Sequence, residues 1–253
     1  MNQVTEKKSA PLPANIFEED AAKGLGNIGQ QDLALPFLKI LGQLSPEVNK
    51  RDGKHVEGSE PGMIFNSVSG DLYDGVKGID VVPCFYRLEY IEWRDRGEGL
   101  GAPINIYDSS SDILSKTTPD ANYKDRLPNG NYVEKTASHF VIILEDVLSS
   151  TALISMKSTQ LKISRKWNSM MSGMKMRGKN GLFTTASFSH IYKLKTTQLT
   201  NDKGTWFGWE VSKKGPLTSS TLYTQAKAFS ESIAKGSVRA KHGEDKPTTE
   251  SII

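Results

Sequence analysis

The longest apolar stretch of the chain, residues 78–93, most constrains the fold because a proline interrupts it. The stretch is rich in β-branched and aromatic residues, which is typical of a strand. Pro83 lies inside it, and a proline within a strand occurs at an edge or at a bulge that bends the strand. Strongly bent strands are the ones that close small barrels. The stretch therefore predicts a β-rich fold built around one long, bent strand.

Other segments with strand-like alternation or an unbroken apolar run surround this long strand. They are residues 63–68, 138–144, 151–157, 187–199 and 204–211. The last two flank Thr200-Asn201-Asp202-Lys203, which predicts a hairpin with a four-residue loop. Residues 94–135 are rich in Gly, Ser and Asp and lack an apolar pattern, so we expect a long loop there.

Helical spacing of apolar residues predicts three helices. In residues 159–171 the apolar positions include Trp167, which we therefore expect in the core. Residues 33–41, capped by Asp32, predict a short helix that docks on the main domain. After Pro216 a helix with its apolar stripe on one face is expected to end at Gly236. That stripe consists of Leu222, Ala226, Phe229 and Ile233.

The order of these elements indicates a mainly β protein with helices (α+β). A five-stranded barrel with one helix between its third and fourth strands is the oligonucleotide/oligosaccharide-binding (OB) arrangement. We therefore predict an OB-like five-stranded barrel with one inserted helix, a C-terminal helix and flexible termini. The predicted domains are a flexible arm (1–31), a single domain (32–236) with the long loop at about 94–135, and a flexible tail (237–253).

The positive charge of the chain is concentrated in one segment. The whole chain has 32 Lys and Arg residues against 29 Asp and Glu residues, yet residues 147–201 contain no acidic residue at all. The basic residues of this segment are Lys157, Lys162, Arg165, Lys166, Lys175, Arg177, Lys179, Lys193 and Lys195. Aromatic residues lie within and just beyond it. Clustered cations with interleaved rings are typical of a groove for single-stranded nucleic acid, since cations neutralise phosphates and rings stack on bases.

The expected hairpin places one ring beside a cation. With a four-residue loop, Leu199 faces Gly204, and Trp206 then lies on the solvent side with Lys195 as a diagonal neighbour. The predicted nucleic-acid site comprises the nine cations together with Trp206, Tyr192, Trp93 and Arg87. Two alternatives stay open: a solvated basic face over an ordinary aromatic core, and a Trp206 ring covered by a loop or by the arm.

Catalytic signatures are absent from the sequence, so we expect a protein that is not an enzyme and has no cofactor or metal site. Cys84 is the one cysteine, and a buried inert thiol is expected there. The best enzymatic alternative is a metal-dependent nuclease that uses Asp80 with Glu89 or Glu92. A further alternative is a structural or virion protein whose basic segment contacts an acidic partner.

Four short motifs are distinctive. They are Leu35-Pro36-Phe37-Leu38-Lys39-Ile40-Leu41 with Ser45-Pro46-Glu47-Val48, Pro61-Gly62-Met63-Ile64-Phe65-Asn66, Asp74-Gly75, and Gly78-Ile79-Asp80-Val81-Val82-Pro83-Cys84. With these motifs the chain resembles a group of bacteriophage-encoded proteins of DNA replication and recombination. The resemblance implies an OB-fold protein that binds single-stranded DNA without sequence preference, and it allows a homo-oligomer. Many such proteins recruit replication or recombination partners through an acidic tail with an apolar tip. Here the tip is Ile252-Ile253, and the preceding residues are only slightly acidic.

The expected location is the cytoplasm, meaning the host-cell cytoplasm for a phage-encoded protein. The first eight residues are too polar for a signal peptide, and no apolar run approaches a membrane span. A lone cysteine cannot form an intramolecular disulfide, which fits a reducing compartment.

Overall fold

The computed structural model describes residues 14–21, 23–24, 33–95, 97–98, 101–145, 149–202 and 204–238. The chain divides into two units, 1–33 and 34–253. In the first unit, α1 (Ala14–Glu19) forms a short helix. Most of the predicted arm, and the predicted tail from residue 239 onward, lie outside the described residues. No helix in the described part of the chain is long and apolar enough to span a membrane.

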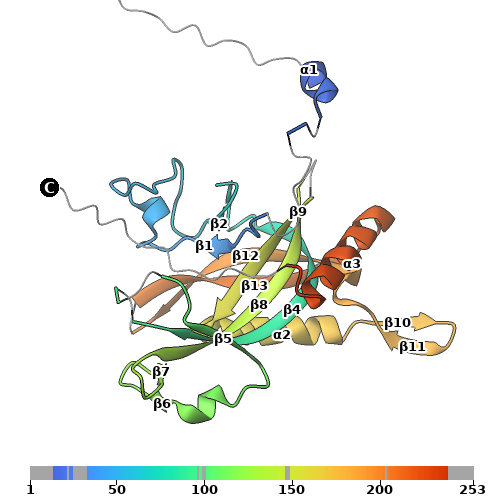
Figure 1. Cartoon of the computed structure of the whole chain (residues 1–253). Helices are drawn as coiled ribbons and strands as arrows, with labels where there is room; N and C mark the ends of the chain where they lie inside the picture. Colours follow the sequence, from blue (N-terminus) through green and yellow to red (C-terminus); the bar gives the residue numbers. More distant parts are fainter. Residues whose placement is uncertain are drawn as a thin grey trace, which may run out of the picture. The chain divides into compact units, whose positions relative to one another are not determined.

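The second unit is built on one large antiparallel sheet (Figure 1). Its main path runs β13-β12-β4-β8-β7-β6, while β9 pairs with β8 and β5 pairs with β4. The strands are β4 (Ile79–Trp93), β5 (Asn105–Asp108), β6 (Thr118–Pro119), β7 (Asp125–Arg126), β8 (Tyr132–Leu144), β9 (Ser149–Lys157), β12 (His190–Asn201) and β13 (Gly204–Pro216). The prediction of a mainly β protein with helices is confirmed.

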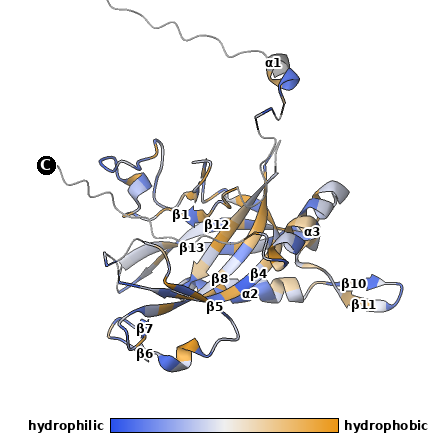
Figure 2. Cartoon of the chain, viewed as in Figure 1, coloured by the Kyte–Doolittle hydropathy of each residue, from blue (hydrophilic) through white to orange (hydrophobic). Residues whose placement is uncertain are grey.

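The long strand predicted around Pro83 is confirmed as β4, and it carries the predicted irregularity. Its register against β8 shifts between Pro83 and Phe85. Such a shift bends a strand, because one extra residue must be accommodated on one side of the ladder. Strands β4 and β8 curve together in Figure 1, so that the sheet curls into a half-barrel. Figure 2 shows that hydrophobic residues concentrate on the central strands of this sheet.

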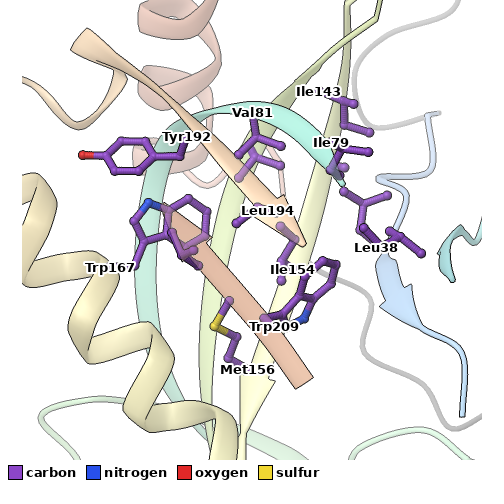
Figure 3. Close-up of a cluster of buried hydrophobic side chains, with 14 of the residues drawn as sticks. Leu38, Ile79, Val81, Ile143, Ile154, Met156, Trp167, Tyr192, Leu194 and Trp209 are labelled. Carbon is purple, nitrogen blue, oxygen red and sulfur yellow. The ribbon is translucent and has the colours of Figure 1, made fainter. Parts of the chain in front are cut away.

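The inner face of the curled sheet packs against α2 (Leu161–Ser172), which follows the 3-10 turn η4 (Ser158–Gln160) after β9. Trp167 of α2 is fully buried and reaches towards Tyr192 of β12, as Figure 3 shows. Both the predicted helix and the predicted core position of Trp167 are confirmed. The outward side of this helix therefore remains available to solvent.

The outer face of the sheet is covered by α3 (Ser220–Ala234). The Ser219 side chain caps the helix by accepting a hydrogen bond from the backbone N–H of Leu222. The predicted stripe is confirmed, because Ala226, Phe229 and Ile233 are all buried against the sheet. The helical spacing of the apolar residues was enough to predict this helix from the sequence.

A small second sheet is formed by β1 (Leu38–Ile40), β2 (Ile64–Asn66) and β3 (Leu72–Tyr73), with η2 (Pro46–Val48) between β1 and β2. The helix predicted for residues 33–41 is therefore wrong. Phe37 forms a parallel bridge to Leu153 of β9, and the Pro36 carbonyl accepts the Leu153 N–H at 2.8 Å. Pairing with the main sheet overrides the local pattern, although the segment does dock on the main domain as predicted.

The described strands do not form a closed barrel. They contain no ladder between β9 and β13, so the five-stranded OB-like barrel is not confirmed. The small sheet and its connections instead contact both β9 and β12. On the β12 side, the Thr196 N–H donates to the Gly75 carbonyl at 2.8 Å, and the Thr196 hydroxyl donates to the Gly62 carbonyl at 2.5 Å.

The segment 94–135, predicted as a long loop, contains structure of its own. It includes β5, the 3-10 turn η3 (Ile113–Lys116), β6, β7 and the first residues of β8. A buried carboxylate holds it together: Glu92 of β4 accepts hydrogen bonds from Asn105, Tyr107, Asn129 and Asn131. Asn and Tyr residues far apart in sequence meet only in the folded chain, so composition alone could not indicate this network.

Candidate nucleic-acid interface

The outward face of α2 carries three basic residues. Lys162, Arg165 and Lys166 are exposed, while Ser164 and Trp167 are buried on the opposite side. Positions three and four apart share one face of a helix, so the three cations lie together. None of them forms an ion pair with an acidic residue in the described ranges, in keeping with the absence of acids from residues 147–201. Their charge is therefore available to an external anion.

The chain continues from α2 into a protruding hairpin. Strands β10 (Lys175–Gly178) and β11 (Gly181–Thr184) form a two-stranded sheet of their own. Residues 175–184 are all exposed, and Figure 1 shows the hairpin extending beyond the end of α2, away from the main sheet. No strand was predicted from the sequence in this region, so the regular hairpin is a finding of the structure. Gly178 and Gly181 are paired with each other next to the turn, which is a hairpin signal.

The hairpin has two chemically different faces. Met176 pairs with Phe183, and Arg177 pairs with Leu182. Because paired residues share a face and neighbours alternate, Lys175, Arg177 and Leu182 lie on one face, and Met176 and Phe183 lie on the other. Lys179 lies in the turn, which Figure 2 colours as hydrophilic. The hairpin thus presents three cations and exposed apolar side chains on one small ribbon.

The Phe183 ring lies against a glycine. A Cβ added at Gly178 would lie 3.2 Å from Cε1 and 3.3 Å from Cδ1 of Phe183, so the ring rests on backbone that has no side chain. Phe183 nevertheless remains 49% exposed. An aromatic ring supported on one side and open to solvent on the other is the geometry on which an unpaired base stacks.

The remaining predicted cations are placed differently. Lys157 forms an ion pair with Glu134 at 2.8 Å. Lys193 forms one with Asp80 at 2.8 Å, and Lys214 also pairs with that carboxylate. Burial would raise the pKa of Asp80, but the hydrogen bonds from both lysines outweigh it and lower the pKa. Lys195 is exposed and lies opposite Glu210. We define the α2–hairpin surface as Lys162, Arg165, Lys166 and residues 175–184. The predicted cations Lys157, Lys193 and Lys195 are not part of it.

Two rings of the predicted site, Tyr192 and Trp93, are buried in the structure. Tyr192 is 0% exposed and packs against Trp167, and its burial raises the pKa of the phenol. Trp93 is 7% exposed at the end of β4. Alternation along a strand gives the face of a residue but not what covers that face, and both rings are covered. Neither ring is open to a base in this structure.

Arg87 holds α3 to the sheet. Its guanidinium donates to the Ile233 carbonyl at 3.1 Å and lies over the rings of Phe85 and Phe140. An arginine that satisfies a helix carbonyl and covers aromatic rings has a structural role. The prediction that it contacts nucleic acid gains no support from this arrangement.

Trp206 is half-buried rather than fully exposed. Asn201 pairs with Gly204, so the predicted register of β12 against β13 was displaced by two residues, and Trp206 faces Leu199. A shift of two keeps each residue on its predicted face, but it moves Lys195, which lies opposite Glu210, out of the diagonal position beside Trp206. The space above Gly208 is filled, however, since a Cβ there would lie 2.5 Å from Nε2 of Gln160. A role for Trp206 stays a prediction.

Sequence reasoning missed Phe183 and Met176 as site residues. The available signal was the sequence Gly178-Lys179-Asn180-Gly181, which has hairpin turn chemistry and is flanked by Met176 and Phe183 at equal distances from the turn. A loop assignment does not say which side chains lie on the same face. The pairing of β10 with β11 does.

The acidic residues considered for a nuclease do not converge. Asp80 and Glu92 lie near opposite ends of β4, and each is engaged by protein side chains. Burial would raise the pKa of Glu92, but its hydrogen bonds outweigh that effect and lower the pKa to about 2. The described residues contain no group of three or more His, Cys, Asp or Glu side chains arranged to hold a metal ion. Cys84 is buried, and its burial raises the pKa of the thiol to about 12.

The chain was compared with protein families, with curated proteins and with solved structures. A family model described as Pam3 phage gp34-like protein matches residues 5–239, which is most of the chain. Searches of curated proteins and of solved structures return no significant match.

Proposed function

Because the chain belongs to the Pam3 phage gp34-like protein family, a family of phage proteins, we propose that it binds single-stranded DNA during phage DNA replication or recombination. The observation that supports this proposal is the α2–hairpin surface. It combines six cations that have no acidic partner among the described residues with an exposed ring supported by Gly178. Binding is without sequence preference, since phosphates and ring stacking carry no base code.

The arrangement of strands supports an OB-like interpretation as part of this proposal. Strand β4 pairs with both β8 and β12, β8 pairs with β9, and β12 pairs with β13. The helix α2 lies between β9 and β12 in the chain, which is the helix position of an OB fold. OB folds are partly open barrels that bind oligonucleotides. We propose that the half-barrel is an open relative of that fold, with the small sheet beside its open edges.

The proposal predicts a defined salt dependence. Each phosphate that a lysine or arginine neutralises releases counterions, so log K falls by about 0.7 per contact as log salt rises. Engagement of four to six cations would give a slope of about −3 to −4. Duplex DNA should bind less tightly, because its bases are not free to stack.

Fluorescence anisotropy with labelled oligo-dT at several salt concentrations tests the proposal. We expect the triple variant Lys162→Gln, Arg165→Gln, Lys166→Gln to lower affinity at least about tenfold and to make the salt slope shallower by about 2. The control variant Lys50→Gln, Lys227→Gln, Lys235→Gln removes the same charge from exposed positions elsewhere and should bind like the wild type. Equal loss in both variants would contradict a specific surface.

The alternatives give different results in the same assay. Equal affinity for oligo-dT, duplex and heparin would favour a structural protein whose basic surface contacts an acidic partner. Loss of the labelled strand on addition of Mg²⁺ would favour the nuclease. Either result would overturn the proposed function.

A further inference from the structure

The two faces of the β10–β11 hairpin point in opposite directions. The ring of Phe183 and the side chain of Met176 are on one face, while Lys175 and Arg177 are on the other. A single strand lying on one face would use its bases or its phosphates there, but it would leave the other face unused. A molecule that uses both faces must offer stackable bases on one side of the ribbon and a phosphate backbone on the other.

A junction between single-stranded and double-stranded DNA has this chemistry. At a fork, the last base pair exposes a flat face for stacking, and the displaced strand presents its phosphates nearby. We propose that the hairpin inserts at such a junction, with Phe183 stacked on the terminal base pair and the Lys175–Arg177 face against the phosphates of one separated strand. This inference rests on the proposed binding of single-stranded DNA and assigns a preferred substrate and a strand-separating action to the same surface.

The shape and composition of the hairpin fit this task. It is exposed on both faces and extends beyond the end of α2, so a junction can approach without meeting the main sheet (Figure 1). Met176 is 52% exposed beside Phe183, and apolar side chains inserted at base steps are known to unstack them. The ribbon consists of two strands of four residues, each about 13 Å long. A two-stranded ribbon of this kind is narrow enough to enter the major groove of DNA, which is about 12 Å wide.

Binding to forked DNA tests this inference. We compare a fork with two unpaired arms, the matching duplex and oligo-dT of equal length, with 2-aminopurine placed at the junction pair. The wild type should prefer the fork about fivefold or more over oligo-dT and should raise the 2-aminopurine signal, since stacking adds roughly tenfold per base. Phe183→Ala with Met176→Ala should weaken binding to both DNAs, to the fork at least about fivefold more than to oligo-dT, so that the preference and the signal are lost.

A matched control removes an apolar side chain from the other face. Leu182→Ala affects a residue that is 71% exposed beside Arg177, and it should keep the 2-aminopurine signal. Phe183→Tyr should keep both preference and signal, because it retains the ring. Since these side chains are exposed, none of the variants should lower the unfolding temperature, which circular dichroism verifies.

Two outcomes would overturn the inference. Wild-type protein that binds oligo-dT and the fork equally would leave the proposed function in place and refute the junction role. Loss of fork preference in Leu182→Ala to the same degree as in the double variant of Phe183 and Met176 would refute the assignment of faces. Failure of the wild type to bind oligo-dT at all would instead refute the proposed function.

Discussion

The indole of Trp167 stacks on the imidazole of His139, with ring centroids 4.5 Å apart and an angle of 18° between the planes. Nε2 of His139 also lies 2.8 Å from the hydroxyl of Ser164, one turn before Trp167 on α2. These contacts fasten α2 to β8 in the core. Because α2 carries the cations of the proposed site, the stacked pair determines where those cations lie.

Burial lowers the pKa of His139 from 6.5 to about 3. In the unfolded chain the imidazole takes up a proton near pH 6.5, whereas in the folded chain it stays neutral down to about pH 3. The free energy of unfolding therefore falls as pH drops from about 6.5 towards 3. We expect His139→Phe, which keeps a ring against Trp167, to show a smaller loss of unfolding free energy between pH 7 and pH 5. Urea denaturation at the two pH values measures it. An unchanged pH dependence would contradict this role.

Glu92 should contribute stability that is lost at lower pH than the contribution of His139. Its folded pKa of about 2 lies below the ordinary 4.5, so its contribution is complete above pH 4.5 and is lost as pH falls towards 2. We expect Glu92→Gln to lower the unfolding free energy at pH 7 by up to about 3 kcal/mol. The control Glu98→Gln removes an exposed carboxylate and should unfold like the wild type in urea.

Arg87 should matter for stability and not for DNA. We expect Arg87→Met to lower the unfolding free energy by about 1.5–3 kcal/mol, because the Ile233 carbonyl loses a charged donor. Affinity for oligo-dT should change by less than about twofold. A fall in affinity for oligo-dT as large as that of the α2 triple variant would show that Arg87 contributes to DNA binding.

Single charge removals distinguish cations that already have an acidic partner from cations that do not. Lys166 has no acidic partner among the described residues, whereas Lys193 forms an ion pair with Asp80. We expect Lys166→Gln to make the slope of log K against log salt shallower by about 0.7, and Lys193→Gln to leave it unchanged. Equal slopes for the two variants would show that the ion pair does not withhold Lys193 from DNA.

The local pattern of the sequence was sufficient for the elements that bury one face. The bend at Pro83, the apolar stripe of α2 around Trp167 and the stripe of α3 all appear in the structure, because a periodic apolar pattern reports its own secondary structure. The concentration of cations in residues 147–201 was equally visible in the sequence. The sequence did not show which of these cations would be exposed and which would form ion pairs with acidic residues.

Only the tertiary structure decided how these elements meet. Residues 33–41 became extended because β2 and Leu153 offer them backbone partners that are distant in the sequence. Tyr192 was buried by Trp167. In each case the deciding contact joins residues through a ladder or a packed core. A sequence pattern reports which side of a segment prefers burial, and it carries no information on which distant segment will provide the partner.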